Sequence, residues 1–350
     1  MHPRQPRIAW GILPIFVLAA CTSSPAPAAT ALPASPQPPP LVTRRLAFSS
    51  NLSNPNDYEI YLVGLDGTGL VNLTNSPSRD TIPLWSPDGR RIAFISDREP
   101  AGIYAMNPDG SEVTLLTDQR VSCNMPDETL AWSPDGKTFS FVTCRDGQPE
   151  IYLVGADGKG LTNLTNNPAK DFPFFWSPDS RRILFTSNRE GNEEVYLMNA
   201  DGSDMERLTD SPSTDAAQGW CPDGTQVIFL SDRDGNPEIY RLDADGSDLL
   251  RLTNDPGIDA YAVWSPAGDR IAVMTNRDGS NEIYLMNPDG TGTANLTRTL
   301  ATEALYQWSG DGSLIVASAF AGEKWSTEII QTDGSGMTAL EYVGYMSLWP

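Results

Sequence analysis

The chain has 350 residues, with 45 acidic side chains against 24 basic ones and a formal net charge of −21. A surface this acidic repels phosphate backbones and anionic headgroups, so the composition argues against binding to nucleic acid and against charge-driven binding to lipid. The single histidine is His2, and no Gly-x-Ser-x-Gly motif is present. Because hydrolytic triads and many metal centres depend on histidine, we expect no enzyme and no cofactor.

Residues 1–20 are predicted to be an export signal that takes no part in the fold. A basic start at Arg4 and Arg7 precedes an apolar run that is too short to span a membrane. The run ends in Leu18-Ala-Ala-Cys21, which resembles the lipobox of bacterial lipoproteins. That resemblance implies cleavage before Cys21 and lipidation of its thiol. An ordinary secretory signal with a nearby cysteine is the alternative.

Residues 21–43 are predicted to be a tether. They are rich in proline, alanine and serine and carry no charged side chain. Such a segment cannot bury enough apolar surface to fold, and its prolines keep it extended. We therefore expect an exported protein, held by lipid on the periplasmic or extracytoplasmic face of a bacterial membrane, with its folded domain in residues 44–350.

That domain repeats one short motif, Trp85-Ser-Pro-Asp-Gly89. The repeat tryptophans are 47, 44, 44, 44 and 44 residues apart, at Trp85, Trp132, Trp176, Trp220, Trp264 and Trp308. Each copy contains four short β-prone segments. A Ser-Pro-Asp-Gly turn joins the first two, and an Asp-Gly pair joins the last two. A repeat of this length and content is typical of the four-stranded blade of a β-propeller.

The number of segments predicts seven blades. Six copies begin with a tryptophan, but segments two to four occur seven times, because an additional set opens the domain at residues 45–74. The missing first segment stands at the C-terminus, in residues 345–350. Pairing of this last strand with the first blade would close the ring and remove both free sheet edges. We expect an all-β, seven-bladed propeller of four-stranded antiparallel blades, with six blades as the alternative.

These motifs resemble the WD-like repeats of the TolB propeller family. The resemblance rests on Trp-Ser-Pro-Asp-Gly, Ile-Ala-Phe, Ser-Asp-Arg-Asp-Gly, Glu-Ile-Tyr and Asp-Gly-Ser, and it covers about 300 of the 350 residues. It implies the fold and says little about function, because one propeller scaffold serves many tasks. TolB itself has an α/β domain before six blades, whereas this chain has a tether and seven predicted blades, so the expectation is a TolB-like protein and not TolB.

An acid stands five residues before each repeat tryptophan, at Asp80, Asp127, Asp171, Asp215, Asp259 and Glu303. Because the first strand of a blade lines the central channel, these carboxylates are predicted to ring one mouth of it. They could bind a cation such as calcium or a basic peptide. The alternative is structural, because five of the copies carry a matching arginine after the second strand, at Arg98, Arg145, Arg189, Arg233 and Arg277. We favour structural ion pairs.

The pattern breaks in two neighbouring blades. Glu303 has no matching arginine, and its blade carries Lys324 and Trp325 instead; the split blade has Gly344 in the place of the acid and Asn51 near that of the arginine. This break predicts a binding site that includes Glu303, Lys324 and Trp325.

The other motifs point to structure. Asp-Gly-Ser turns lack the twelfth-position glutamate of an EF-hand loop, so we expect hairpin turns and no metal there. Cys123 and Cys144 are predicted to lie close enough for a disulfide, which an exported compartment permits, and Cys221 is predicted to be a buried thiol.

Two functions remain open from the sequence. The first is a scaffold, expected to be monomeric, that binds an envelope protein through one channel mouth. The alternative is a propeller that binds a small ligand, a cation or a carbohydrate, with degradation of a bound carbohydrate as one form of this alternative.

Overall fold

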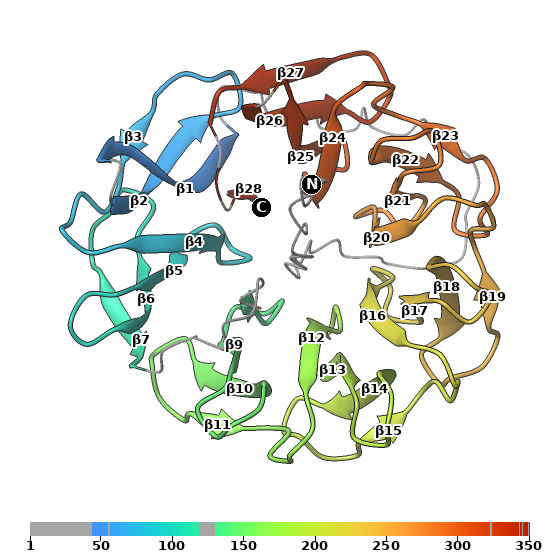
Figure 1. Ribbon diagram of the computed structural model, residues 1–350. Helices are drawn as coiled ribbons and strands as arrows, with labels where there is room; N and C mark the ends of the chain where they lie inside the picture. The colour runs from blue at the N-terminus through green and yellow to red at the C-terminus, as the bar shows by residue number, and fades with distance from the viewer. Residues whose placement is uncertain are drawn as a thin grey trace, which may run out of the picture.

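The computed structural model describes residues 44–54, 57–118, 130–322, 324–342, 344, 346–348 and 350. The regular elements in these ranges are 28 β-strands, arranged as seven four-stranded antiparallel sheets around a central axis (Figure 1). Within the same ranges, no helix has the length and apolarity needed to cross a membrane. The prediction of seven blades is confirmed, and the six-bladed alternative is wrong.

The strands of each blade follow one another outward from the axis. Blade 1 contains β28 (Met346–Leu348), β1 (Arg45–Asn54), β2 (Asp57–Gly64) and β3 (Val71–Asn72); blade 2 contains β4 (Asp80–Trp85), β5 (Ile92–Ser96), β6 (Gly102–Met106) and β7 (Thr114–Thr117). Blade 3 contains β8 (Leu130–Trp132), β9 (Thr138–Thr143), β10 (Glu150–Gly155) and β11 (Thr162–Asn163); blade 4 contains β12 (Asp171–Trp176), β13 (Arg182–Ser187), β14 (Glu194–Asn199) and β15 (Glu206–Arg207). Blade 5 contains β16 (Asp215–Trp220), β17 (Gln226–Ser231), β18 (Glu238–Asp243) and β19 (Leu250–Arg251); blade 6 contains β20 (Asp259–Trp264), β21 (Ile271–Thr275), β22 (Glu282–Met286) and β23 (Ala294–Asn295). Blade 7 contains β24 (Thr302–Trp308), β25 (Leu314–Ala321), β26 (Lys324–Gln331) and β27 (Met337–Leu340).

The ring closes as the sequence predicts. β28 pairs antiparallel with β1, with Leu348 opposite Leu46 and Met346 opposite Phe48. The last strand thus becomes the inner strand of the first blade, and both ends of the propeller chain lie in one sheet (Figure 1). This arrangement covers two sheet edges that would otherwise be open to another chain.

The repeat tryptophans join each blade to the one before it. The indole N–H of Trp220 donates to the backbone oxygen of Phe175 at 3.2 Å, and that of Trp308 donates to Val263 at 3.3 Å. The apolar cores lie in the same places, because each cluster of buried side chains draws on two neighbouring blades. Blades therefore pack mainly through their faces, which explains why the tryptophan recurs in every copy.

Turn chemistry fixes the inner hairpins. In the first Ser-Pro-Asp-Gly turn, the N–H of Gly89 donates to the carbonyl of Ser86 at 2.9 Å, and Gly89 has a φ of 67°. The Ser86 hydroxyl donates to Asp88 at 2.7 Å. The glycine accepts a left-handed conformation that other residues adopt at a cost, so this turn holds β4 against β5 in one register.

Candidate functional site

One face of the propeller carries the turns between the second and third strands of the blades, and it also carries the start of each inner strand. In blade 2, for example, Asp80 at the start of β4 lies opposite Ser96 at the end of β5. We call this the arginine face, after the residues in its turns: Arg98, Arg145, Arg189, Arg233 and Arg277.

The predicted ion pairs form at four blades of the arginine face. The nitrogen–oxygen distances are 2.8 Å for Arg98–Asp80, 2.9 Å for Arg189–Asp171, 2.6 Å for Arg233–Asp215 and 3.4 Å for Arg277–Asp259. All four aspartates are fully buried. Asp127, the predicted partner of Arg145, lies outside the described residues.

Each arginine also lies over aromatic rings of its own blade. The Arg233 guanidinium carbon is 5.3 Å from the ring centre of Phe229 and 4.9 Å from that of Tyr240, and these two rings stack. The ring faces and the carboxylate hold the cation from two sides. Aspartates sealed in this way are not open to a ligand in the channel, so this geometry supports the structural interpretation.

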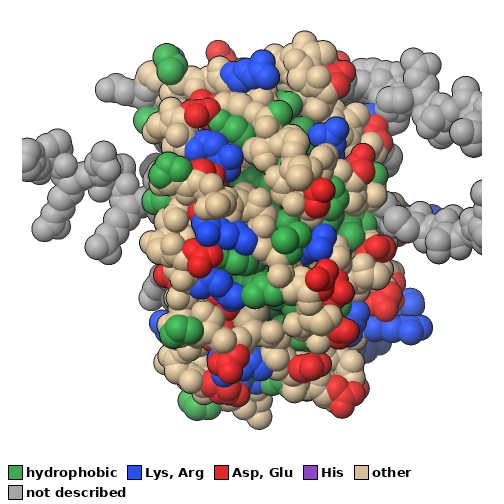
Figure 2. Space-filling model, turned by 90° about the vertical axis from the view of Figure 1, so that its right-hand side faces the viewer, with side chains coloured by type: hydrophobic (Ala, Val, Ile, Leu, Met, Phe, Trp, Pro, Cys, Tyr) green, Lys and Arg blue, Asp and Glu red, His purple; other side chains and the backbone are tan. Residues whose placement is uncertain are grey.

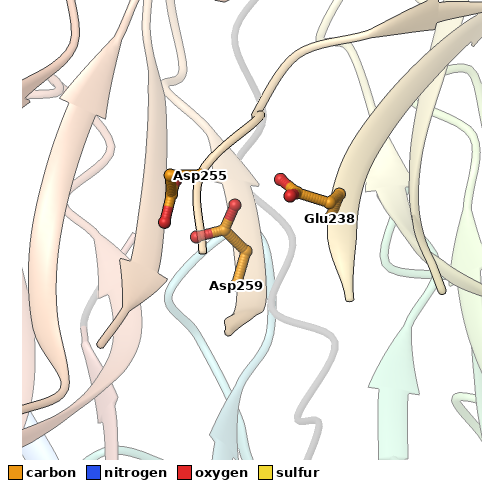
Figure 3. A group of neighbouring side chains, drawn as sticks. All are labelled: Glu238, Asp255 and Asp259. Atoms are coloured by element: carbon orange, nitrogen blue, oxygen red, sulfur yellow. The ribbon is translucent and has the colours of Figure 1, made fainter. Parts of the chain in front are cut away.

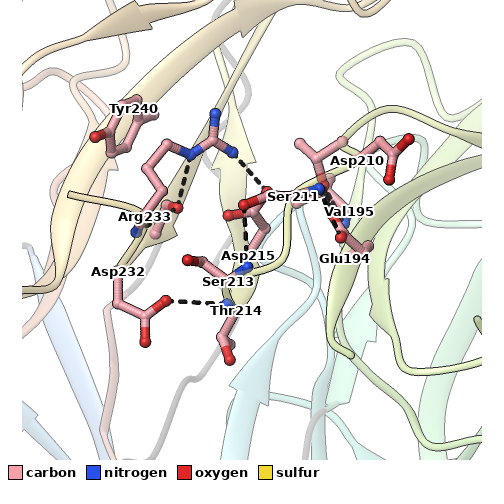
Figure 4. A network of polar contacts seen from close by, with 12 residues as sticks. Glu194, Val195, Asp210, Ser211, Ser213, Thr214, Asp215, Asp232, Arg233 and Tyr240 are labelled. Atoms are coloured by element: carbon pink, nitrogen blue, oxygen red, sulfur yellow. Dashed lines mark hydrogen bonds and ion pairs between the residues drawn. The ribbon is translucent and has the colours of Figure 1, made fainter. Parts of the chain in front are cut away.

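A second carboxylate, near the start of the third strand, supports the junction that follows blades 1, 3, 4, 5 and 6, as Figure 4 shows for blades 4 and 5; blade 2 has Gly102 at this position. Glu194 on β14 accepts hydrogen bonds from Asn192 at 2.9 Å, Arg207 at 2.8 Å, Thr209 at 2.6 Å and the backbone N–H of Ser211 at 2.9 Å. Burial raises the pKa of Glu194, but these donors outweigh burial and hold it below its ordinary value.

Blade 7 departs from this scheme in its register. The sequence aligns Glu328 with Glu194, but the strands place Glu328 opposite Ala317, whereas Glu194 lies opposite Ser187. Ser326 therefore occupies the position that Glu194 has in blade 4, and Glu328 occupies the position of Tyr196. The predicted alignment of Glu328 is therefore wrong by two residues.

The shift leaves two buried carboxylates without an arginine. Glu303 on β24 is 1% exposed, and Glu328 on β26 is 6% exposed. The Thr299 hydroxyl donates to Glu303 at 2.7 Å, but Oε2 of each glutamate has no hydrogen-bond partner among the described residues. Burial raises the pKa of Glu328 to about 7, and the charge on Glu303 adds to the rise. Burial likewise raises the pKa of Glu303.

The same shift lengthens the β25–β26 hairpin at its turn, on the arginine face. Its last pairs are Phe320 with Trp325 and Ala321 with Lys324, beyond the position where the second strands of blades 2 to 6 end. The two aromatic rings lie 5.0 Å apart and are 39% and 45% exposed. Lys324 is exposed beside them. The structure thus places Lys324 and Trp325 at a hairpin tip, and it buries Glu303 near the start of the inner strand of the same blade.

The neighbouring hairpin of blade 1 is also long. β1 has 10 residues and β2 has 8, and Leu52 near the turn is 51% exposed. Because both hairpins join second to third strands, they lie on the arginine face of adjacent blades (Figure 1). We call Leu52, Phe320 and Trp325 the apolar tips. By contrast, the flank in Figure 2 carries acidic and basic side chains interspersed with isolated apolar ones.

Two of the four cysteines lie among the described residues. Cys144 is disulfide-bonded, and Cys221 is a buried thiol. Cys123, the predicted partner of Cys144, lies outside the described residues, as does Cys21, the predicted lipidation site. The Asp-Gly turns are hairpin turns: Asp201 accepts from the backbone N–H of Ser203 at 3.0 Å and from its hydroxyl at 2.6 Å.

Sequence reasoning missed Phe320 and Glu328 as members of the site. The sequence did indicate that Phe320 is unusual, because it continues an apolar run at a position where the chain turns in the other blades. For Glu328 the sequence was misleading, because Glu328-Ile-Ile reads like the Glu-Ile-Tyr of the other copies.

Comparisons with known proteins agree with the fold. The family model of the TolB beta propeller domain matches residues 117–209 and 188–345. The uncharacterized peptidase YuxL of Bacillus subtilis is 40% identical over 88 residues, which is 24% of this chain and 13% of that protein. A protein TolB homolog of Chlorobium luteolum is 30% identical over 137 residues, or 37% of this chain and 30% of that protein.

The chain therefore matches less than a third of the length of either relative. Among solved structures, an oligogalacturonate lyase in complex with manganese superposes with a TM-score of 0.66 at 14% identity, covering 82% of this chain and 85% of that one. At this identity the likeness concerns the fold.

Proposed function

The chain belongs to the TolB β-propeller family, and on this premise we propose that it is an exported, lipid-anchored scaffold that binds a protein partner at the cell envelope. The observation that carries the proposal is the pair of apolar hairpin tips on blades 7 and 1. Phe320 and Trp325 are exposed together, and aromatic side chains exposed in this way are typical anchors of protein interfaces.

Two further features support this surface. It lies on two blades that lack the ion pair between a turn arginine and an inner-strand aspartate, which blades 2, 4, 5 and 6 have. It also lies on a rigid ring whose closure is completed by β28 in blade 1. A rigid scaffold that presents two protruding hairpins loses little conformational entropy when it binds.

Charge indicates the kind of partner. The chain carries a net charge of −21, and the turns of the arginine face carry exposed carboxylates such as Asp97, Glu190 and Asp232. An acidic face with apolar tips fits a protein that presents an apolar segment flanked by lysine or arginine. The predicted tether, residues 21–43, would let the propeller reach such a partner from the membrane.

The test is capture of the partner from its native membrane after mild crosslinking, followed by mass spectrometry. We expect one envelope protein to be enriched and to be displaced by excess uncrosslinked full-length chain. The double variant Phe320→Ser/Trp325→Ser should lose that protein, because it removes both aromatic anchors. A matched control is Leu249→Ser, which changes a 52%-exposed apolar residue beside the outermost strand of blade 5.

The control variant should retain the partner. Equal capture by the wild type and by the double variant would refute the apolar tips as the binding surface. Capture that excess chain does not displace would refute protein binding as the function.

A further inference from the structure

The junction between blades 5 and 6 differs from the other described junctions at one position. Four residues before the inner-strand acid, the described copies carry a side chain that can donate a hydrogen bond: Ser76, Asn167, Ser211 and Thr299. Asn167 and Thr299 donate to their acids at 2.7 Å each, and Ser76 donates at 3.1 Å. Blade 6 has Asp255 at this position, and an ionised aspartate accepts hydrogen bonds but cannot donate one.

This replacement brings three carboxylates together, as Figure 3 shows. Glu238 comes from β18 of blade 5, Asp255 from the loop between the blades, and Asp259 from the start of β20. One ligand oxygen from each lies within 4.8 Å of the other two. Glu238 and Asp259 are fully buried, and Asp255 is partly buried.

The arginines at this junction leave two buried oxygens unpaired. Arg251 binds Oε1 of Glu238 at 2.8 Å, and Arg277 binds Asp255 at 2.7 Å and Oδ1 of Asp259 at 3.4 Å. Among the described residues, no donor reaches Oε2 of Glu238 or Oδ2 of Asp259. In Figure 3 the Glu238 carboxylate points across the junction toward the two aspartates.

The junction of blades 4 and 5 in Figure 4 is the matched case with serine. There, Asn192, Arg207, Thr209 and Ser211 supply Glu194 with four donors. Asn192 and its equivalent in the aspartate junction, Asn236, both donate to two backbone oxygens of the interblade loop, but Asn192 also donates to the glutamate and Asn236 does not. Because Oδ1 of Asp215 also lacks a donor, the difference in donors between the two junctions lies at the glutamate.

The charges differ in the same way. At the serine junction, the two buried carboxylates of Glu194 and Asp215 face Arg207 and Arg233, so the buried charges balance; Arg207 also binds the exposed Glu190 and Asp210. The junction with Asp255 has three buried or partly buried carboxylates facing two arginines, and Arg251 also binds the exposed Asp234. One negative charge remains uncompensated in a buried setting, where an unpaired charge is costly.

We propose that Glu238, Asp255 and Asp259 bind a calcium ion between blades 5 and 6. The donor set consists of carboxylate oxygens, which calcium prefers and which zinc or copper sites seldom use alone. Oxygens on opposite sides of one calcium ion are about 5 Å apart, which matches the spread of this cluster. The ion would supply the partner that Oε2 of Glu238 and Oδ2 of Asp259 lack.

The test is isothermal titration of the chelator-treated, full-length chain with calcium chloride, together with thermal unfolding in calcium and in chelator. We expect one calcium ion per chain and a melting temperature about 5 °C higher in saturating calcium, because an ion that binds only the folded state stabilises it. Asp255→Ser restores the residue found at the neighbouring junction and should abolish both responses while the variant still unfolds cooperatively in chelator.

Two controls guard this result. Asp255→Asn keeps the shape of the side chain and should also lose calcium binding, which protects the test against a folding defect of the serine variant. Asp210→Ser removes an acid of the preceding junction whose side chain is 90% exposed, and it should respond to calcium like the wild type.

Three outcomes would overturn the proposal. The first is an equal calcium response in the wild type and Asp255→Ser, which would place the ion elsewhere. The second is a response to magnesium chloride without one to calcium chloride. The third is no response to either ion, which would mean that a proton neutralises the third carboxylate.

Discussion

Replacing Glu328 with glutamine should make the propeller more stable at alkaline pH. Burial raises the pKa of Glu328 from an ordinary value of 4.5 to about 7. Between pH 4.5 and about 7, the Glu328 carboxyl therefore holds a proton in the folded state that it releases in the unfolded state. This contribution to stability is fully present below pH 4.5 and is lost as the pH rises through about 7.

The size of the effect follows from the two pKa values. A rise of this extent corresponds to about 3 kcal/mol of the free energy of unfolding. Glutamine has nearly the same shape and cannot ionise, so Glu328→Gln should exceed the wild type by up to about 3 kcal/mol at pH 8. The two proteins should be nearly equally stable at pH 4.5. For a domain of this size the difference is roughly 5 °C in melting temperature.

The assay is differential scanning calorimetry of both full-length proteins between pH 4.5 and pH 8.5. Glu194→Gln is the matched control, because it also removes one acidic charge at a blade junction. The pKa of Glu194 lies below its ordinary value, so its charge stabilises the fold above pH 4.5, and this contribution is lost as the pH falls. The control should therefore be less stable than the wild type at pH 7. A Glu328→Gln variant whose advantage is absent at pH 8, or is equal at both ends of the range, would refute the reasoning.

Two other predictions concern the closure of the ring. Removing residues 346–350 deletes β28 and exposes an edge of β1, so the melting temperature should fall by 10 °C or more in calorimetry, the loss of several kcal/mol; an unchanged melting temperature would contradict a closed ring. Gly344→Ala should also destabilise the fold by about 2 kcal/mol or more, because its new Cβ would lie 1.7 Å from the backbone oxygen of Ser49. Gly336→Ala is its control, since nothing lies within 4 Å of that position, and equal melting temperatures for the two variants would refute the close approach.

Most of the fold could be predicted because it depends on local chemistry repeated many times. The turn at Gly89 acts within its own blade, and Trp220 contacts the preceding blade. The residues that determine these contacts therefore recur in the copies of the repeat. The ion pair of Arg233 with Asp215 was predictable for the same reason, because strand pairing places Asp215 opposite Ser231, and Arg233 follows two residues later in the turn.

The register of blade 7 could not be predicted from its apolar pattern, and the reason is geometric. Side chains alternate between the two faces of a strand, so a shift of one residue would turn every apolar side chain outward. A shift of two residues keeps each side chain on its original face. The apolar pattern around Glu328 therefore fits both registers equally well. The spacing to the next Asp-Gly turn distinguishes them, because Asp333 stands five residues after Glu328, whereas Asp201 stands seven residues after Glu194.

The calcium-binding cluster shows a different limit. The aspartate at position 255 is visible in an alignment of the copies, but its meaning depends on Glu238, which comes from the previous blade. Spacing along the chain gives no sign that the two carboxylates meet across a junction. The Ser211 junction supplies the comparison, because there the same glutamate position has its full set of donors.

Two consecutive junctions of this propeller hold carboxylates that arginines do not balance. Burial raises the pKa of Asp259 to about 6 and that of Glu328 to about 7, whereas Glu194 at the preceding junction stays below its ordinary value. A change of pH between 6 and 7, or of calcium concentration, should therefore act on blades 5 to 7. Because the apolar tips Phe320 and Trp325 belong to the last of these blades, the conditions at the cell envelope would act on the part of the ring that is proposed to bind the partner.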